Sequence, residues 1–154
     1  MGKIGQEGKR PGELSEDEKF ETLRGKVLEV VQAPWGKHIL HEKGEWGALK
    51  TLHVNPKART SDQSHQKRSE HWAVVQGRAR VFLECDLGEE HPVKRVVELG
   101  VGETITIPLK AWHRLENPDN KEMLVIVERI SGLYDEDDIK RRDDDYGRAN
   151  MAGQ

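Results

Sequence analysis

The chain lacks most features of secreted, membrane-bound or thiolate-rich proteins. Of its 154 residues only Cys85 is a cysteine, which excludes an intramolecular disulfide framework and a thiolate cluster for zinc, and suits a reducing compartment. Residues 1–10 contain glycine and charge but no apolar run, so we expect neither a signal peptide nor a membrane anchor, and a cytoplasmic location. A bound metal would therefore need nitrogen and oxygen ligands.

An excess of charge of one sign is also missing. The 25 basic and 28 acidic residues are mostly interspersed and give a formal charge of −3, so no basic face indicates nucleic acid or an anionic membrane as a partner. We expect a small soluble partner instead. The hydrophobic and charged fractions are both 34%, and the apolar residues must therefore be concentrated in short elements.

The length and the absence of repeats favour one domain, which we place at residues 23–148, between a flexible tail at 1–22 and a flexible end at 149–154. Short apolar or alternating runs separated by Gly and Pro predict about nine strands, typical of a closed barrel or sandwich. The expected strands are 26–31, 38–41, 49–54, 71–75, 78–84, 95–99, 104–107, 112–115 and 123–130. Helices are expected only from Ser15 towards Leu23, where the pattern is that of a capping box, and over 135–142.

The most informative stretch contains Gln63, His65 and Glu70 and ends at Gly77. Residues two apart on a strand share a face, so Gln63 and His65 can point into the same cavity. Glu70 lies on the next strand, and Gly77 supplies a turn. One hairpin can thus present three converging ligand atoms.

A second stretch, again with the pattern strand, turn, strand, contains Gly102, Pro108, His113 and Asn117. His113 can supply a fourth ligand from the opposite side of a barrel. An amide oxygen, two imidazoles and a carboxylate suit zinc first, with manganese, iron, cobalt or nickel as alternatives, whereas calcium would need more oxygens. A single histidine in a strand is more often a packing or surface residue, so the spacing of the whole set carries this prediction.

In order and spacing, the two stretches resemble the two motifs of the cupins. Gln63 stands where cupins usually have His, and Lys110 where they usually have Gly. The Gln-x-His-x4-Glu-His-Trp pattern is similar to that of the cupin-type (type II) mannose-6-phosphate isomerases. The resemblance extends from Pro34 to Arg148 and includes the segments Pro34–Gly36, Arg68–Trp72, His113–Pro118, Gly132–Tyr134, Glu136–Ile139 and Asp145–Arg148.

This resemblance implies an all-β cupin fold, a double-stranded β-helix or jelly-roll barrel, with the predicted short C-terminal helix. It also implies a divalent metal held by Gln63, His65, Glu70 and His113, and interconversion of mannose 6-phosphate and fructose 6-phosphate on the route to GDP-mannose. In many members the domain follows a mannose-1-phosphate guanylyltransferase domain. The chain has no Gly-rich nucleotide loop, so we expect a stand-alone isomerase domain, and by resemblance a homodimer.

Three further residues are candidates for the chemistry. Lys50 matches a family lysine and is a candidate base, because partial desolvation can lower the pKa of a lysine; an exposed barrel lysine is the alternative. Arg68 and Arg148 match family arginines and are candidates to bind the phosphate, since a guanidinium fork suits its geometry. Surface ion pairs are the alternative for both.

The remaining candidates can be assigned to one face of a strand or the other, because residues an even number of positions apart share a face. Ser61 shares parity with Gln63 and is expected to line the pocket, whereas Arg114 should lie on the face opposite His113, with an open role. Core packing is expected for the two tryptophans Trp35 and Trp72. Structural or exposed positions are expected for His38, His41, His53 and His91.

Several positions near the pocket depart from the family pattern and leave the sugar open. They are Ala33, Ala48, Thr60, Asp62 and Lys110, and an ion pair between Asp62 and Lys110 is one possibility. A sugar-phosphate-binding cupin without catalysis and a metal-dependent oxygenase are the alternative functions.

Overall fold

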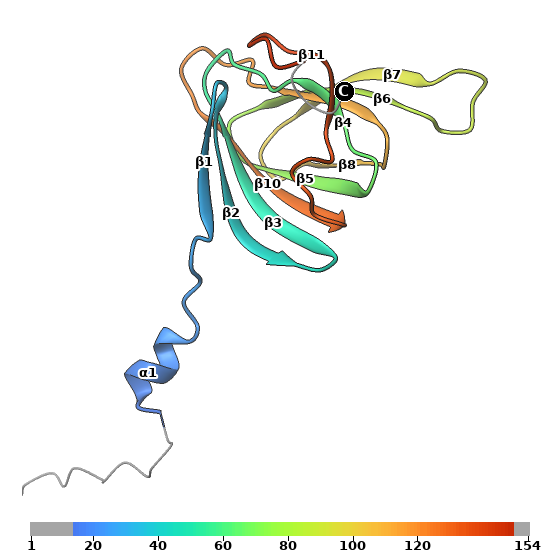
Figure 1. Cartoon of the computed structure of the whole chain (residues 1–154). Coiled ribbons are helices and arrows are strands. Elements are labelled where there is room, and N and C mark those ends of the chain that lie inside the picture. Colours follow the sequence, from blue (N-terminus) through green and yellow to red (C-terminus); the bar gives the residue numbers. More distant parts are fainter. Residues whose placement is uncertain (1–13, 150–154) are drawn as a thin grey trace, which may run out of the picture.

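The alternating runs of the sequence form two antiparallel sheets that together build a barrel (Figure 1). The computed structural model describes residues 14–149. One sheet has the strand order β1-β2-β3-β10-β5-β8, and the other β11-β4-β9-β6-β7. The strands are β1 Glu29–Ala33, β2 Gly36–Gly44, β3 Gly47–Val54, β4 Asp62–Ser64, β5 Arg68–Gln76, β6 Ala79–Cys85, β7 Val93–Leu99, β8 Thr104–Ile107, β9 Trp112–Glu116, β10 Leu124–Gly132 and β11 Lys140–Asp143.

The period of two along each strand decides which side chains enter the barrel. In β3 every second residue from Ala48 to Val54 is buried, as is every second residue from Arg68 to Val74 in β5. Most apolar inward residues form one core with contributions from both sheets, including Val54, Val74, Val81, Leu115, Leu124 and Ile126, and Ala48 belongs to a smaller cluster with Leu40 and Ile130. The polar members of the same set face the interior as well.

Three of these inward residues are cross-strand neighbours in the first sheet. Lys50 of β3 pairs with Glu128 of β10, which pairs with Trp72 of β5. Directly paired residues on one face of a sheet have side chains in contact range. The register therefore brings a lysine, a carboxyl group and an indole together inside the barrel.

The prediction of an all-β fold is confirmed, and each of the nine predicted strands overlaps an observed one. The structure adds β4 and β11, which pair with each other at one edge of the second sheet. Strand β4 contains Gln63, which the spacing of the motif residues already predicted to lie on a strand.

The predicted C-terminal helix over 135–142 is wrong. The side chain and carbonyl of Asp135 accept hydrogen bonds from the N–H groups of Asp137 and Asp138, so the chain turns instead. Lys140–Asp143 then pairs as β11 with β4. The stretch has charges at helical spacing but no apolar stripe to bury, and β4 offers unpaired backbone groups that an added strand satisfies.

The predicted N-terminal helix is confirmed as α1, Glu16–Glu21. Ser15 Oγ accepts from Glu18 N at 3.2 Å, and Glu18 Oε2 accepts from Ser15 N at 2.7 Å, which makes a capping box. Figure 1 shows α1 standing away from the barrel, and none of its residues is buried. The tail boundaries at 22 and 149 stay predictions, since residues 1–13 and 150–154 lie outside the described residues.

Within residues 14–149, no helix has the length and apolar character needed to cross a bilayer.

Gly132 at the end of β10 is a position where any side chain should cost stability. Its φ is +114°, and an added Cβ would collide with the carbonyl oxygen of Lys67 and lie 3.1 Å from Arg68 Cα. We expect Gly132→Ala to lower the free energy of unfolding by ~2 to 4 kcal/mol, through backbone strain and steric conflict together. Urea denaturation followed by circular dichroism would measure the loss.

Gly88 is the matched control, because its φ is +81° but an added Cβ would meet nothing within 4 Å. Gly88→Ala should cost only the backbone strain, about 1 kcal/mol. Equal losses in the two variants would contradict the close approach at Gly132.

Candidate metal centre and adjoining cavity

Three potential metal ligands meet inside the barrel from separate segments. Glu70 projects inward from β5, His113 from β9, and His65 directly follows β4. Their ligand atoms all lie within 4.8 Å of one another. Each residue is at most 2% exposed, so the cluster is screened from bulk solvent. These are three of the four predicted ligands.

Backbone carbonyls set the tautomers of both histidines. His65 Nδ1 lies 2.6 Å from the carbonyl oxygen of Asp138, and His113 Nδ1 lies 3.0 Å from that of Ala111. A carbonyl can only accept, so each Nδ1 carries the proton and donates it. In the neutral rings each Nε2 then has its lone pair directed at Glu70, which is the arrangement of a metal-ligating histidine.

Glu70 lies between these two nitrogens. Its Oε1 is 3.1 Å from His65 Nε2, and its Oε2 is 3.4 Å from His113 Nε2. Burial raises the pKa of Glu70, whereas protonated His113 and His65 rings would donate to this carboxyl and hold its pKa well below its usual range. With both rings neutral, a bound cation would take over that role. Among residues 14–149, neither Glu70 Oε2 nor His113 Nε2 has a hydrogen-bond partner. An ionised carboxylate and lone pairs facing one another fit a bound cation.

Arg68 supplies the cationic group closest to this cluster. Its Nε lies 3.2 Å and its Nη2 3.1 Å from Glu70 Oε1, and Nη2 is 3.3 Å from His65 Nε2. Burial at 7% exposure strengthens the attraction to the carboxylate, because the surrounding dielectric is low. Arg68 thus steadies Glu70 from the side of the cavity.

Gln63, the fourth predicted ligand, stands beside this triad. It pairs with His113 across β4 and β9, and its Oε1 accepts a hydrogen bond from Ser61 Oγ at 2.9 Å. The side chains of Gln63 and Ser61 both line the cavity described below, as the two-residue spacing between them predicted. Ligation by Gln63 stays a prediction.

The donor set is one carboxylate and two imidazoles, and it fits a divalent transition metal better than calcium. Within the described part of the chain, no second group of three His, Cys, Asp or Glu side chains gathers in this way.

A cavity of about 380 Å³ adjoins the cluster and is walled by both sheets and the C-terminal segment. The predicted residues that line it are Lys50, Ser61, Gln63, Arg68, Glu70 and Arg148. The lining residues to which the sequence assigned no functional role include His38, Glu128, Glu136 and Arg141. The wall is therefore more densely charged than the motifs alone indicated.

Lys50 is buried at 3% exposure and faces this cavity. Its Nζ donates to Glu136 Oε1 at 2.9 Å and lies 4.7 Å from the centre of the Tyr134 ring. The Tyr134 hydroxyl donates to the same carboxylate oxygen of Glu136. The exposed-lysine alternative is thus wrong, and Lys50 is part of the cavity.

Glu128 is a buried carboxyl group that the sequence motifs missed. Burial, followed by the charge of Glu70, raises the pKa of Glu128 to about 8, so it is mostly protonated at neutral pH. Its Oε2 accepts a hydrogen bond from Trp72 Nε1 at 2.9 Å. The register of β10 against β5 was needed to find it, because Glu128 lies far from both motifs in the sequence.

His38 was expected to be structural or exposed, and it lines the cavity instead. Its ring stacks on Trp35, with ring centroids 6.4 Å apart. Burial and then the charge of Lys50 lower the pKa of His38. Trp35 itself is buried at 7% exposure, as predicted.

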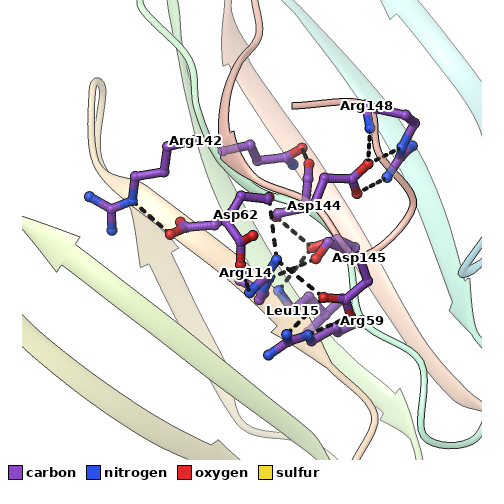
Figure 2. Close-up of polar contacts among 12 residues, drawn as sticks. Arg59, Asp62, Arg114, Leu115, Arg142, Asp144, Asp145 and Arg148 are labelled. Carbon is purple, nitrogen blue, oxygen red and sulfur yellow. Dashed lines mark hydrogen bonds and ion pairs between the residues drawn. The ribbon is translucent and has the colours of Figure 1, made fainter. Parts of the chain in front are cut away.

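The C-terminal segment that walls the cavity is held by arginines of the barrel (Figure 2). Arg114 Nε donates to the carbonyl of Thr60 at 2.9 Å and its Nη1 to Asp143 Oδ2 at 3.0 Å. Arg59 binds both carboxylate oxygens of Asp145, at 2.7 and 2.8 Å. Arg114 therefore does lie opposite His113, and its role is to anchor this segment.

Asp62 also binds the C-terminal segment, and the ion pair considered with Lys110 is wrong. Arg142 Nε donates to Asp62 Oδ2 at 2.7 Å, and its guanidinium lies 4.6 Å from the Trp112 ring. Lys110 instead occupies a turn with a φ of 65°. Figure 2 shows Arg142 directed away from Arg148, on the other side of the segment.

Asp138 joins the C-terminal segment to the loop that carries His65. Its Oδ1 and Oδ2 accept from the N–H groups of Gln66 and Lys67, both at 2.9 Å, while its carbonyl orients His65. Burial raises the pKa of Asp138, but these two N–H groups outweigh burial and lower the pKa below its usual value.

Comparison with known proteins places these motifs in a family context. A family model described as "Mannose-6-phosphate isomerase C-terminal" matches residues 21–144. The chain is 44% identical over 119 residues to the mannose-1-phosphate guanylyltransferase ManC of Salmonella typhimurium, covering 77% of this chain and 23% of that protein. It is 40% identical over 138 residues to the alginate biosynthesis protein AlgA of Pseudomonas syringae pv. tomato, covering 89% and 26%. The chain thus spans about a quarter of the length of these relatives.

Solved structures show the same barrel at low sequence identity. Oxalate decarboxylase of Bacillus subtilis superposes with a TM-score of 0.62 at 18% identity, over 74% of this chain and 30% of that one. The Cnp3 cupin domain of Schizosaccharomyces pombe gives a TM-score of 0.54 at 7% identity, over 68% and 69%. These likenesses concern the fold alone, and they confirm the predicted cupin barrel.

Asp138→Asn should destabilise the protein at neutral pH, because an amide offers only one oxygen to the two partly buried N–H groups of Gln66 and Lys67. We expect a loss of about 1 to 3 kcal/mol in the free energy of unfolding at pH 7. Since folding lowers the pKa of Asp138, its carboxylate stabilises the fold above the unfolded pKa of about 3.9, and this contribution disappears as pH falls through the folded pKa.

Denaturant unfolding of both proteins between pH 7 and pH 3 would test this expectation. The difference between wild type and Asp138→Asn should be largest at pH 7 and shrink below about pH 4. Asp137→Asn, at the exposed neighbouring residue, should change little at either pH. A difference that grows in acid would contradict the assigned hydrogen bonds.

Proposed function

Because the chain belongs to the mannose-6-phosphate isomerase C-terminal family, we propose that it is a metal-dependent aldose–ketose isomerase that interconverts mannose 6-phosphate and fructose 6-phosphate. The observation that carries this proposal is the buried cluster of His65, Glu70 and His113 beside a cavity walled by cationic side chains. A metal centre and a cationic wall are the two things that a sugar phosphate needs from such a site.

In this proposal His65, Glu70 and His113 hold the metal together with Gln63, and zinc is the first choice for the ion. When bound, a divalent cation supplies Lewis-acid stabilisation of the negative charge that develops on the sugar oxygens. The protonated Nδ1 atoms of both histidines fix the ring orientations for this role.

The reaction requires a proton to move between C2 and C1 of the open-chain sugar, and we assign this transfer to Lys50. A lysine must lose a proton before it can act as a base. The hydrogen bond of 2.9 Å from Lys50 Nζ to Glu136 Oε1 fixes the position of the amine in the cavity. The uncharged carboxyl group of Glu128, which pairs with Lys50 on the neighbouring strand, can donate a hydrogen bond to the sugar.

A sugar-phosphate-binding domain without catalysis is the second candidate. The ion pair between Lys50 and Glu136 favours it, because an amine engaged with a carboxylate at 2.9 Å is not free to take a proton from the sugar. Pairing as a homodimer and a cytoplasmic location stay predictions under either function.

Removal of a metal ligand should abolish turnover. We expect Glu70→Gln to lower metal affinity by at least 100-fold, on the order expected when a charged ligand is lost, and to eliminate activity in a coupled assay with mannose 6-phosphate. A chelator should do the same to the wild-type protein. Metal content measured by mass spectrometry would separate loss of metal from loss of chemistry.

His71→Gln is the matched control, since His71 adjoins Glu70 on β5 but lies outside the cavity and contacts Thr106. It should retain metal and activity within about threefold, as surface substitutions usually do. If Glu70→Gln still bound metal stoichiometrically, the assignment of the metal centre would be wrong.

Substitution of the proposed base should affect chemistry and leave the metal in place. Lys50→Gln is expected to lower kcat by about 10²- to 10⁴-fold, the usual contribution of a positioned base, with unchanged metal content. Steady-state kinetics on a panel of hexose phosphates would measure this loss. Saturable sugar-phosphate binding with no turnover by the wild-type protein would instead favour the binding domain.

A further inference from the structure

Two guanidinium groups of the cavity wall carry buried N–H groups that lack an acceptor. Arg68 Nη1 and Arg141 Nε are both buried, and neither has a hydrogen-bond partner among residues 14–149. Both side chains line the cavity beside the metal cluster. Leaving a buried charged donor unpaired is costly, so these two N–H groups are candidate donors to an anion bound in the cavity.

Arg68 satisfies the first requirement for an anion site, a rigid and desolvated donor. It is 7% exposed, and its Nε and Nη2 are held at 3.2 and 3.1 Å from Glu70 Oε1. The Tyr134 ring lies 5.7 Å from its guanidinium carbon. With two nitrogens fixed in this way, Nη1 is the nitrogen left to bind a ligand.

Arg141 reaches the same cavity from β11, where it pairs with Gln63 of β4. Burial lowers the pKa of Arg141, and the charge of Arg148 lowers it further. These two arginines therefore repel each other at the wall. A bound anion would relieve the repulsion and satisfy Arg141 Nε at once.

Arg148, in contrast, already has a complete partner. Asp144 accepts from its main-chain N–H at 2.6 Å, from its Nε at 3.0 Å and from its Nη2 at 2.8 Å (Figure 2). The side chain of Asp144 is 0% exposed, so this contact is well shielded from solvent. The fork of Arg148 that could bind a phosphate in bidentate fashion is thus occupied.

We propose that Arg141 and Arg68 bind the phosphate group of the substrate, and that Arg148 only positions the segment that carries Arg141. A phosphate has three terminal oxygens that accept charge-assisted hydrogen bonds from two guanidinium groups. Apart from Arg148, which Asp144 neutralises, the wall carries Lys50, Arg68 and Arg141 against the carboxylates of Glu70 and Glu136, and this cationic excess favours an anion. The identity of the sugar rests on the proposed function, whereas the anion site does not.

Titration calorimetry on the full chain with inorganic phosphate, fructose 6-phosphate and fructose would test the assignment. Arg141→Gln should weaken the binding of both phosphate ligands by about 10- to 100-fold, as expected for the loss of a charge-assisted hydrogen bond. Binding of fructose and metal content should not change. Thermal melting of the variant would check that it is folded.

Arg142→Gln is the matched control, because the neighbouring Arg142 binds Asp62 and Glu84 and faces away from the cavity. It should bind phosphate like the wild-type protein. Arg148→Gln should weaken phosphate binding less than Arg141→Gln does. Equal phosphate affinity in Arg141→Gln and Arg142→Gln would overturn the proposal, as would a larger effect of Arg148→Gln or a wild-type protein that binds neither phosphate ligand.

The results also separate this inference from the isomerase proposal. Phosphate binding that depends on Arg141, without turnover of mannose 6-phosphate, would support the anion site and contradict isomerase activity. Turnover with an unchanged KM in Arg141→Gln would support the isomerase and overturn the anion site.

Discussion

The polar interior of this barrel depends on one constraint, the negative charge of Glu70 at a position that is only 2% exposed. An ionised carboxylate is stable there only beside positive charge. Arg68 supplies part of it, and the Nε2 atoms of His65 and His113 define a position where a metal cation would supply the rest. The same charge favours the protonated form of Glu128. One buried carboxylate therefore accounts for the metal cluster and for the uncharged acid beside it.

The C-terminal segment turns this charged interior into a cavity with a defined wall. Asp138 orients His65 through its carbonyl and holds the neighbouring loop through its carboxylate. Glu136 binds Lys50 across the cavity, and Arg141 faces it from β11. The same segment therefore supplies residues to the cavity and orients His65, one member of the buried cluster.

Much of the fold and the centre of the site could be predicted from local pattern. Alternation with period two located every strand that buries one face, and strand parity put Glu70, Gln63 and Ser61 on the inside. The pattern failed over residues 135–142, where charges at helical spacing suggested a helix. A helix there has no apolar stripe, whereas pairing with β4 satisfies backbone groups, so a tertiary contact decided the outcome.

The sequence by itself determined nine of the strands, the spacing of the ligand motifs and the family, because these depend on neighbouring residues and on similarity along the chain. Only the tertiary structure decided that Glu128 and His38 belong to the cavity, that Arg114 anchors the last strand, and that Arg141 has a buried N–H group without an acceptor. The physical reason is that these roles depend on cross-strand register and on which charges remain unpaired after packing. Neither is encoded in any short stretch of sequence.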